Sequence, residues 1–370
     1  MYAKYKLSEK PTAWILMVIA AAVLVAVPGS ATEETEGWKP APPMPEKFDW
    51  VQMTSEEWLK GEIIAMYDES LEFDSDEFDD QSLDWGDIKE IRSVQICQVR
   101  FLDDTILKGK ILLQGDTIQV IGEQPVERQR SQVLSITTGG TKKRDYWTGK
   151  VSAGLNIRTG NTEQTEFNAK ANLIRRTPQS RINIDYLGNF SESDDISIAD
   201  NQRFNANWDR FISNRFYWTP VYGELYRDPF QNIANRYTIG IGLGYTVKDT
   251  AKVDWDVTAG IAYQGTTFDD VLPEEDDTET SPALKMGTRY ENELTGWMDF
   301  HFDYTFFIVS EEAGTYTHHL LTGFEFDLTG DFDFDVDWVW DYIKDPRQNS
   351  EGDFPEQSDF RMMFSLGYSF

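Results

Sequence analysis

A strict alternation of apolar residues with small or polar residues constrains the fold of the C-terminal part of this 370-residue chain. In residues 237–247 the odd positions, from Tyr237 to Val247, are all apolar, and the even positions are all glycine or threonine. A period of two residues is the side-chain period of a β-strand. The run also has the length of roughly 9 to 11 residues with which a tilted strand crosses a bilayer. The pattern therefore predicts membrane-spanning strands.

Twelve segments carry this pattern, which predicts an all-β fold with an antiparallel transmembrane β-barrel of about 12 strands. Tight turns alternate with longer connections, among them loops at 191–201, 265–283 and 343–358. Because short turns of such barrels face the periplasm, we expect both termini on that side. The predicted strands are 147–158, 163–175, 181–190, 202–213, 216–227, 235–247, 252–264, 284–294, 298–309, 315–328, 331–342 and 359–370.

The strands of a soluble β-sandwich also alternate between apolar and polar residues, so this is the main alternative fold. Its strands average about 5 or 6 residues, whereas several of these are about twice as long. The last segment alternates up to the final residue, and so apolar a terminal strand would fray in water but closes a barrel in a membrane. We predict that its apolar positions are the signal read by a barrel-assembly machinery, namely Phe364, Leu366, Tyr368 and Phe370.

The N-terminus has the pattern of a signal peptide over residues 1–31. Three lysines precede the uncharged stretch 12–27, and the small residues Gly29 and Ala31 follow it. The alternative is an uncleaved anchor, but this apolar stretch is shorter than the roughly 20 residues of a spanning helix. We expect cleavage after Ala31 and, with the barrel, residence in the outer membrane of a Gram-negative bacterium.

Residues 32–47 are rich in proline and charge and are interpreted as a linker. Residues 48–138 contain a repeat with an offset of 48, in which Val51 and Leu59-Lys60-Gly61 recur as Val99 and Leu107-Lys108-Gly109. Its short strands predict a small tandem domain of two bent sheets, SH3-like or Sm-like, in the periplasm. A periplasmic protein or a cell-wall component is its possible partner. Residues 139–145 are a basic linker, and 146–370 form the barrel.

The charge balance argues against nucleic acid as a partner. The chain has 34 Lys and Arg against 64 Asp and Glu, a net charge of -30, which repels phosphate. The single cysteine, Cys97, excludes an intrachain disulfide, a cysteine zinc site and an iron-sulfur cluster. We interpret it as a half-buried strand residue and not as a reactive thiol. No cofactor is expected.

Neither catalysis nor a metal site is predicted. His318 and His319 are adjacent on a predicted strand and so point to opposite faces. No serine lies beside His318 on the outward face. The loop from Asp269 to Glu279 is acidic but lacks the ligand spacing of a calcium loop. We interpret it as solvated and expect no enzymatic activity.

Acidic residues lie on the inward positions of several predicted strands. They could form a cation-selective lining, or they could pair with Arg361 and other inward bases. We therefore expect a narrow, cation-preferring channel or permeability protein. The alternative is a non-conducting anchor that presents the periplasmic domain. The candidate lumen residues are Asp254, Asp256, Asp331, Asp333, Asp335 and Asp337.

Three segments resemble the domain-of-unknown-function 481 family of salt-induced outer-membrane proteins: WTGKVSAGLNIRTGNTEQTEF (147–167), NRYTIGIGLGYTVKD (235–249) and FRMMFSLGYSF (360–370). The resemblance covers residues 146–370. It implies an outer-membrane barrel with a link to salt or envelope stress, and it supplies no catalytic residues. The repeat domain lies outside it.

Overall fold

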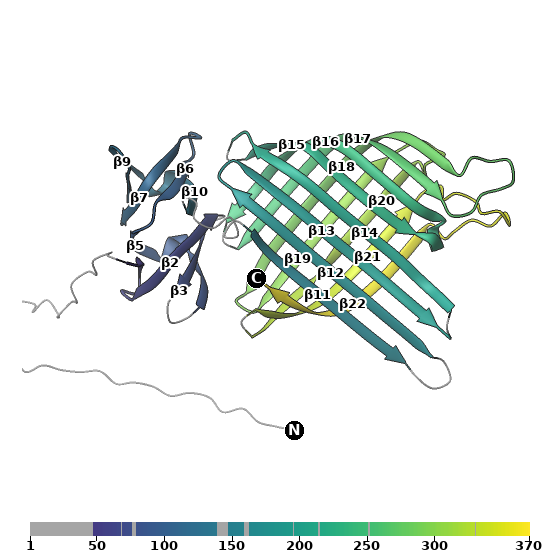
Figure 1. Ribbon diagram of the computed structural model, residues 1–370, viewed down its shortest axis with the longest axis horizontal. Coiled ribbons are helices and arrows are strands. Elements are labelled where there is room, and N and C mark those ends of the chain that lie inside the picture. The colour runs from purple at the N-terminus through teal and green to yellow at the C-terminus, as the bar shows by residue number, and fades with distance from the viewer. Residues whose placement is uncertain are drawn as a thin grey trace, which may run out of the picture. The chain divides into compact units, whose positions relative to one another are not determined.

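The computed structural model describes residues 47–370 except 68, 76–78, 139–146, 159–162, 195, 214, 251 and 330. The predicted signal peptide, most of the first linker and the 139–145 linker lie outside the described residues. The described residues form two β-structures, which are treated one at a time (Figure 1). Within this part of the chain, no helix is long and apolar enough to cross a membrane.

The first structure is built from the repeat. Its elements are β1 (Asp49–Met53), β2 (Trp58–Tyr67), β3 (Ser70–Ser75), β4 (Asp79–Asp84), η1 (Trp85–Asp87), β5 (Ile88–Arg92), β6 (Cys97–Phe101), β7 (Ile106–Gln114), β8 (Thr117–Ile121), β9 (Pro125–Gln129), η2 (Arg130–Gln132) and β10 (Val133–Thr138).

The two copies of the repeat share one barrel. β1 pairs with β2 and β5, and β6 pairs with β7 and β10 in the same way. The copies are joined because β5 pairs with β7 and β10 pairs with β2, which closes the ring. The sequence predicts two sheets, whereas the structure has one closed barrel with hairpins attached. When the barrel closes, it pairs the strand edges that two separate sheets would leave without hydrogen-bond partners.

The core of this small barrel follows the offset of 48. Val51 and Val99 are equivalent and fully buried. Asp49, the counterpart of Cys97, accepts hydrogen bonds from the amides of Ile63 (2.9 Å) and Val94 (2.6 Å). Cys97 is fully buried, not half-buried as expected. Burial, and then the charge of Asp49, raise the pKa of the Cys97 thiol to about 12.

The second structure is a closed antiparallel barrel of twelve strands in chain order, from β11 to β22. β22 pairs with β11 and so closes it, as predicted. The elements are β11 (Trp147–Arg158), β12 (Gln164–Thr177), β13 (Ser180–Ser193), β14 (Ile196–Phe211), β15 (Phe216–Asp228), η4 (Pro229–Gln231), β16 (Ile233–Thr250), β17 (Val253–Phe268), β18 (Thr278–Thr295), β19 (Met298–Ile308), β20 (Tyr316–Thr329), β21 (Phe332–Ile343) and β22 (Ser358–Ser369).

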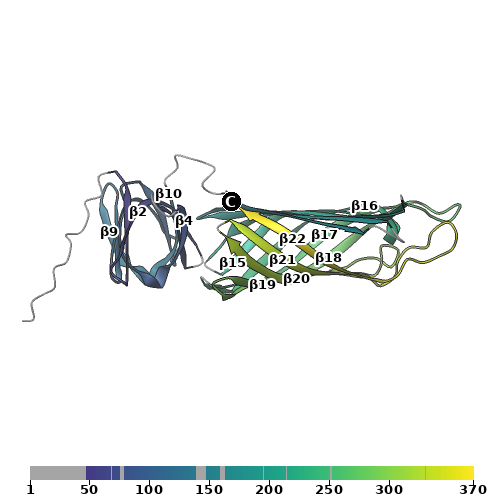
Figure 2. The same ribbon diagram turned by 90° about the horizontal axis from the view of Figure 1, so that it is seen from below.

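The barrel has a turn end and a loop end. The turn end holds the short connections, such as 178–179 and 296–297, and the loop end holds 269–277 and 344–357. Figures 1 and 2, which differ by a 90° rotation, show that the barrel is flattened and not circular. Two opposite walls therefore lie close together, which brings their inward side chains within reach of one another.

Several strands extend farther than the alternation predicts. The expected loop 191–201 belongs mostly to a hairpin of β13 and β14, whose pairing continues to Ser193 opposite Ile196. β18 begins at Thr278, six residues before the predicted start. These extensions are mostly polar, although Ile196 and Ile198 on β14 are exposed, and a strand that projects beyond the bilayer into water needs no apolar face. The alternation therefore marks only the part of each strand that contacts lipid.

The outer face of the barrel is apolar. Ile241 on β16 is 49% exposed and Ile261 on β17 is 62% exposed, and they are direct partners across the two strands. The four predicted signal residues, three on β22 and Phe370 directly after it, also point outward, with Phe364 at 51% and Phe370 at 58% exposure. An apolar belt around a closed barrel is the surface that a bilayer covers.

Candidate functional site: the barrel lumen

One wall of the lumen carries the row of aspartates that the sequence singles out. Asp333, Asp335 and Asp337 alternate along β21, and each is at most 4% exposed. The Nζ atom of Lys150 on β11 lies 3.0 Å from Asp333 and 2.7 Å from Asp335. Lys170 on β12 lies 2.8 Å from Asp337. Each of these acids therefore has a cationic partner, because barrel closure places β11 and β12 near β21.

The other three candidate acids have different surroundings. Asp256 on β17 pairs with Arg181 at 2.7 Å. Asp254 is on the same strand, two residues nearer the turn end, and is partly buried. Asp331 is exposed in the turn before β21. The expected base Arg361 bonds to Asp341 and not to the 333–337 row.

Ion pairs cross the lumen between strands that are not neighbours. Arg203 on β14 lies 2.9 Å from Asp341 on β21. The Arg181–Asp256 pair joins β13 to β17, and Arg289 on β18 lies 3.3 Å from Asp185 on β13. These pairs are possible because the barrel is flattened. They span the lumen and hold its two walls together.

The half of the lumen near the loop end is filled. Leu187, Val339 and Met363 form an apolar cluster that joins β13 to β21 and β22. Nearer the loops, Tyr226 and Ile233 pack with Ile343. All are at most 8% exposed, including Val339 at 0%. A solute path through this half requires side chains to move.

The loops at this end are tied together by Asn232. Its backbone has φ of 59°, a left-handed conformation that asparagine tolerates. Its side chain donates to the Asp270 carbonyl at 2.7 Å and accepts from the Asp270 amide at 2.8 Å. Ser350, from the last loop, donates its hydroxyl and amide to the Asp270 carboxylate, and these bonds lower the pKa of that carboxyl. Three loops are therefore joined over the filled half.

The half near the turn end is more open. A cavity there is lined by residues of nearly every strand, including Asn172, Asn205 and Thr258. Several acids face it without an ion pair among the described residues, namely Glu291, Asp299 and Asp327.

One acidic group near the turn end has the spacing of a metal site. Oxygen atoms of Glu325, Asp327 and Asp333 all lie within 4.8 Å of one another. However, the Nζ atom of Lys150 lies 2.6 Å from Glu325 and 3.0 Å from Asp333. The lysine supplies the positive charge that an ion would bring, so these residues do not indicate a metal site.

The histidines show no catalytic arrangement. His318 points outward, where it stacks on Trp340 at 5.5 Å and shares a hydrogen bond with Tyr304. His319 points inward and bonds to Asp341 at 2.8 Å. The two side chains are on opposite faces, as predicted. Neither has a serine or cysteine among its described hydrogen-bond partners.

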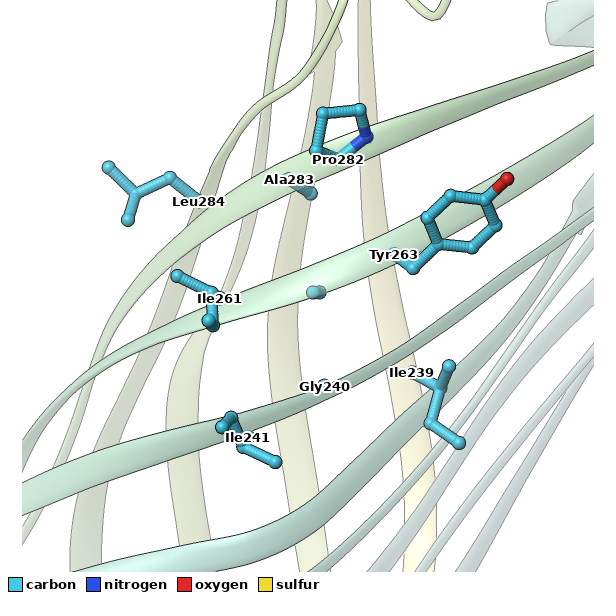
Figure 3. Close-up of a pocket in the computed structure, with 9 residues that line it drawn as sticks. Ile239, Gly240, Ile241, Ile261, Tyr263, Pro282, Ala283 and Leu284 are labelled. Carbon is cyan, nitrogen blue, oxygen red and sulfur yellow. The ribbon is translucent and has the colours of Figure 1, made fainter.

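Figure 3 shows a shallow pocket on the outer face, over β16, β17 and β18. Its side chains form two rows, with Ile241, Ile261 and Leu284 in one row and Ile239, Tyr263 and Pro282 in the other. Both rows point away from the lumen, and the floor between them is strand backbone. An acyl chain fills such a groove in a membrane, so it is a lipid contact and not a solute site.

One family model matches most of the C-terminal part of the chain. The family described as "Protein of unknown function, DUF481" matches residues 151–370. The chain belongs to this family. The match coincides with the twelve-stranded barrel and excludes the repeat structure. No curated protein matches the chain.

Several solved structures have a weak likeness to the chain. The NanC porin is 10% identical over 60% of this chain and 98% of that chain, with a TM-score of 0.34. The outer membrane channel DcaP of Acinetobacter baumannii is 9% identical over 87% and 94%, with a TM-score of 0.30. The translocator domain of the autotransporter NalP from Neisseria meningitidis is 9% identical over 60% and 87%, with a TM-score of 0.29.

Proposed function

We propose that this protein is a narrow outer-membrane channel for small solutes, closed at rest by cross-lumen ion pairs. The observation that carries the proposal is the content of the lumen. Its two walls are joined by paired charges, such as Arg203 with Asp341 and Arg289 with Asp185. Water and permeating ions can replace such pairs when the walls separate.

We further propose that the open channel prefers cations. The bases that line the 333–337 row are already neutralised by aspartates. Asp299 and Asp327 near the turn end have no base partner among the described residues, and an unpaired acid concentrates cations at an entrance. A role under salt or envelope stress stays an expectation from the family resemblance.

The alternative is a barrel that conducts nothing and anchors the repeat structure in the periplasm. The same cross-lumen pairs favour it, together with the filled half of the lumen and the joined loops. In that function the pairs are permanent and contribute only to the stability of the barrel.

Planar-bilayer recording on the full chain distinguishes these functions. If the protein is a channel, exchanging Arg203→Gln and Arg289→Gln together should raise open probability or conductance, because two bridges are lost. Arg227→Gln is the matched control, since Arg227 pairs with Asp200 at 3.1 Å without bridging the lumen and is accessible to solvent. If the wild type and the variants conduct nothing although heat-modifiable migration confirms that they are folded, the channel proposal is wrong and the anchor function is favoured.

A further inference from the structure

The lumen wall of β16 and β17 contains a hollow between two tyrosine rings. The Tyr222 ring lies across Gly240, where an added Cβ would be 2.6 Å from its Cζ atom. The Tyr217 ring covers Gly244 in the same way. Between them lie Gly242 and Gly260, its direct partner on β17, and the nearest atoms to a Cβ added at either glycine are backbone atoms. Both glycines line the cavity near the turn end, so this middle part of the wall is open to the lumen.

Lys285 lies at the edge of the hollow. It is the partner of Gly260 on β18, and its Nζ atom lies 4.3 Å from the centroid of the Tyr222 ring. Among the described residues no carboxylate pairs with it. Two acids whose charges act on Lys285 are already engaged, since Glu224 binds Arg203 at 2.6 Å and Asp303 binds Arg289 at 3.0 Å. Six other lumen bases do have acidic partners, namely Lys150, Lys170, Arg181, Arg203, Arg289 and Arg361.

Tyr222 supplies a second group without a partner. The residue is 5% exposed, and its hydroxyl makes no hydrogen bond within the described part of the chain. Buried polar groups in proteins nearly always have partners, because leaving one unpaired is costly. An ammonium and a phenol are both donors. The group missing from this place is therefore an acceptor, and a carboxylate accepts from both while neutralising Lys285.

We propose that the hollow binds a small solute that carries a carboxylate on a flat ring. The carboxylate accepts hydrogen bonds from Lys285 and, after a small movement of its ring, from the Tyr222 hydroxyl. The solute ring lies on the Gly242–Gly260 floor between the two tyrosines, where aromatic contacts are favourable. No covalent step is involved. This goes beyond the proposed channel, because binding can occur whether or not the barrel conducts.

A preference for cations does not conflict with such a site. Ion selectivity depends on the net charge along the whole lumen, including unpaired acids such as Asp299 and Asp327 near the turn end. Carboxylate binding depends on two donors, Lys285 and Tyr222, and the Nζ atom of the lysine lies 4.3 Å from the centroid of the tyrosine ring. The two properties are therefore set by different residues and are measured separately.

The test is a binding titration of the full-length protein, refolded in detergent, with 4-fluorobenzoate followed by fluorine NMR. We expect saturable binding that unlabelled benzoate displaces. Lys285→Met should weaken it about tenfold or more, because a charged hydrogen bond is lost. Tyr222→Phe keeps the ring and removes the hydroxyl, and should weaken binding severalfold. Gly242→Ala should also weaken it by raising the floor.

Two controls isolate the site. Lys252→Met removes an exposed lysine in a turn, whose side chain is 62% exposed, and should leave binding unchanged. The neutral 4-fluorobenzamide has the same ring and reports partition into micelles. If folded wild type shows no saturable benzoate binding, if Lys285→Met binds as tightly, or if the benzamide binds as tightly as benzoate, the proposal is wrong. Tyr222→Phe and Gly242→Ala keep it testable if Lys285→Met does not fold.

Discussion

Arg289 on β18 and Asp185 on β13 form an ion pair across the barrel, with 3.3 Å between Nη2 and Oδ2. The two strands are far apart in the order of the barrel, so the pair joins opposite walls and not adjacent strands. Arg289 also lies 3.0 Å from Asp303 on the neighbouring strand. One guanidinium therefore links three strands, and such bridges hold the opposite walls of the flattened barrel together.

Asp341 is the acid on which the filled half of the lumen depends. It accepts from Arg203, Arg361 and His319, and it is 3% exposed. Asp341→Asn should lower the free energy of unfolding by about 3 to 5 kcal/mol, because it leaves buried cations without their counter-charge. Urea titration of the barrel in lipid bilayers measures this. Asp359→Asn, at a half-exposed acid 3.7 Å from Arg361, should cost much less. If both substitutions lowered the free energy of unfolding by the same amount, the role given to Asp341 would be contradicted.

Ile241 and Gly242 are adjacent on β16 and face opposite sides of the wall. Ile241→Arg should destabilise the barrel by about 2 to 4 kcal/mol, because it places a charge among acyl chains. Gly242→Arg should lower the free energy of unfolding by less in bilayer titrations, because the new side chain enters the polar lumen. The same side chain would also fill the hollow. A similar loss at both positions would indicate that both faces of the strand are apolar and buried.

The sequence predicts the barrel well because alternation reports directly on which side chains contact lipid. β11 begins and ends at the predicted residues, and the strand count, the closure by the last strand and the outward face of Ile241 are all confirmed. The limits of β18 are predicted less well. Pro282 and the acidic residues near it suggest a loop. In the structure this part of β18 pairs with β17 only. The amide hydrogen that Pro282 lacks is therefore not needed for a hydrogen bond with β19.

The lumen contacts could not be predicted in the same way. The partners of Asp335 and Asp337 come from β11 and β12, which are distant in sequence and are brought near only by barrel closure and flattening. The unpaired state of Lys285 depends on which acids its neighbours engage. In the repeat, the offset of 48 identifies equivalent residues such as Val51 and Val99. It does not indicate that the strands of the two copies pair with each other.

Phe370 makes the last backbone pair of the barrel. Its amide donates to the Gly149 carbonyl at 2.8 Å, and its carbonyl accepts from the Gly149 amide at 2.9 Å. β22 and β11 pair only from Lys150–Ser369 to Ala153–Leu366, so this contact is a large share of the closure. Deleting Phe370 should impair barrel insertion in cells and lower the folded fraction on heat-modifiable gels. Phe354→Ala, at an exposed loop aromatic, is the control. Normal insertion of the deletion variant would argue against a C-terminal signal.

Cys97 should be unreactive in the folded protein. It is fully buried with a pKa raised to about 12, whereas an unfolded cysteine titrates near 8.5. At a pH between these two pKa values the thiol of the unfolded chain has lost its proton, whereas the thiol of the folded chain keeps it. The Cys97 thiol therefore makes the repeat structure less stable as the pH rises through this range. Maleimide labelling of the full chain at pH 8 should be slow and should become fast in denaturant. Ser55→Cys in a Cys97→Ser background, at an exposed turn, should label at once.

The aspartate row of β21 gives the sharpest test of selectivity. Replacing Asp333, Asp335 and Asp337 by Asn leaves Lys170 in the lumen without its counter-charges, and it leaves Lys150 with Glu325 alone. Under a salt gradient the reversal potential of an open channel should therefore move from the cation side toward zero or beyond it. The shift should shrink at high salt, because the Debye length falls from about 10 Å at 0.1 M to about 3 Å at 1 M. A further exchange of both lysines for Met should move the potential back, since the added positive charge is removed. A reversal potential that ignores all five substitutions, or that indicates anions in the wild type, would show that these charges do not set the selectivity.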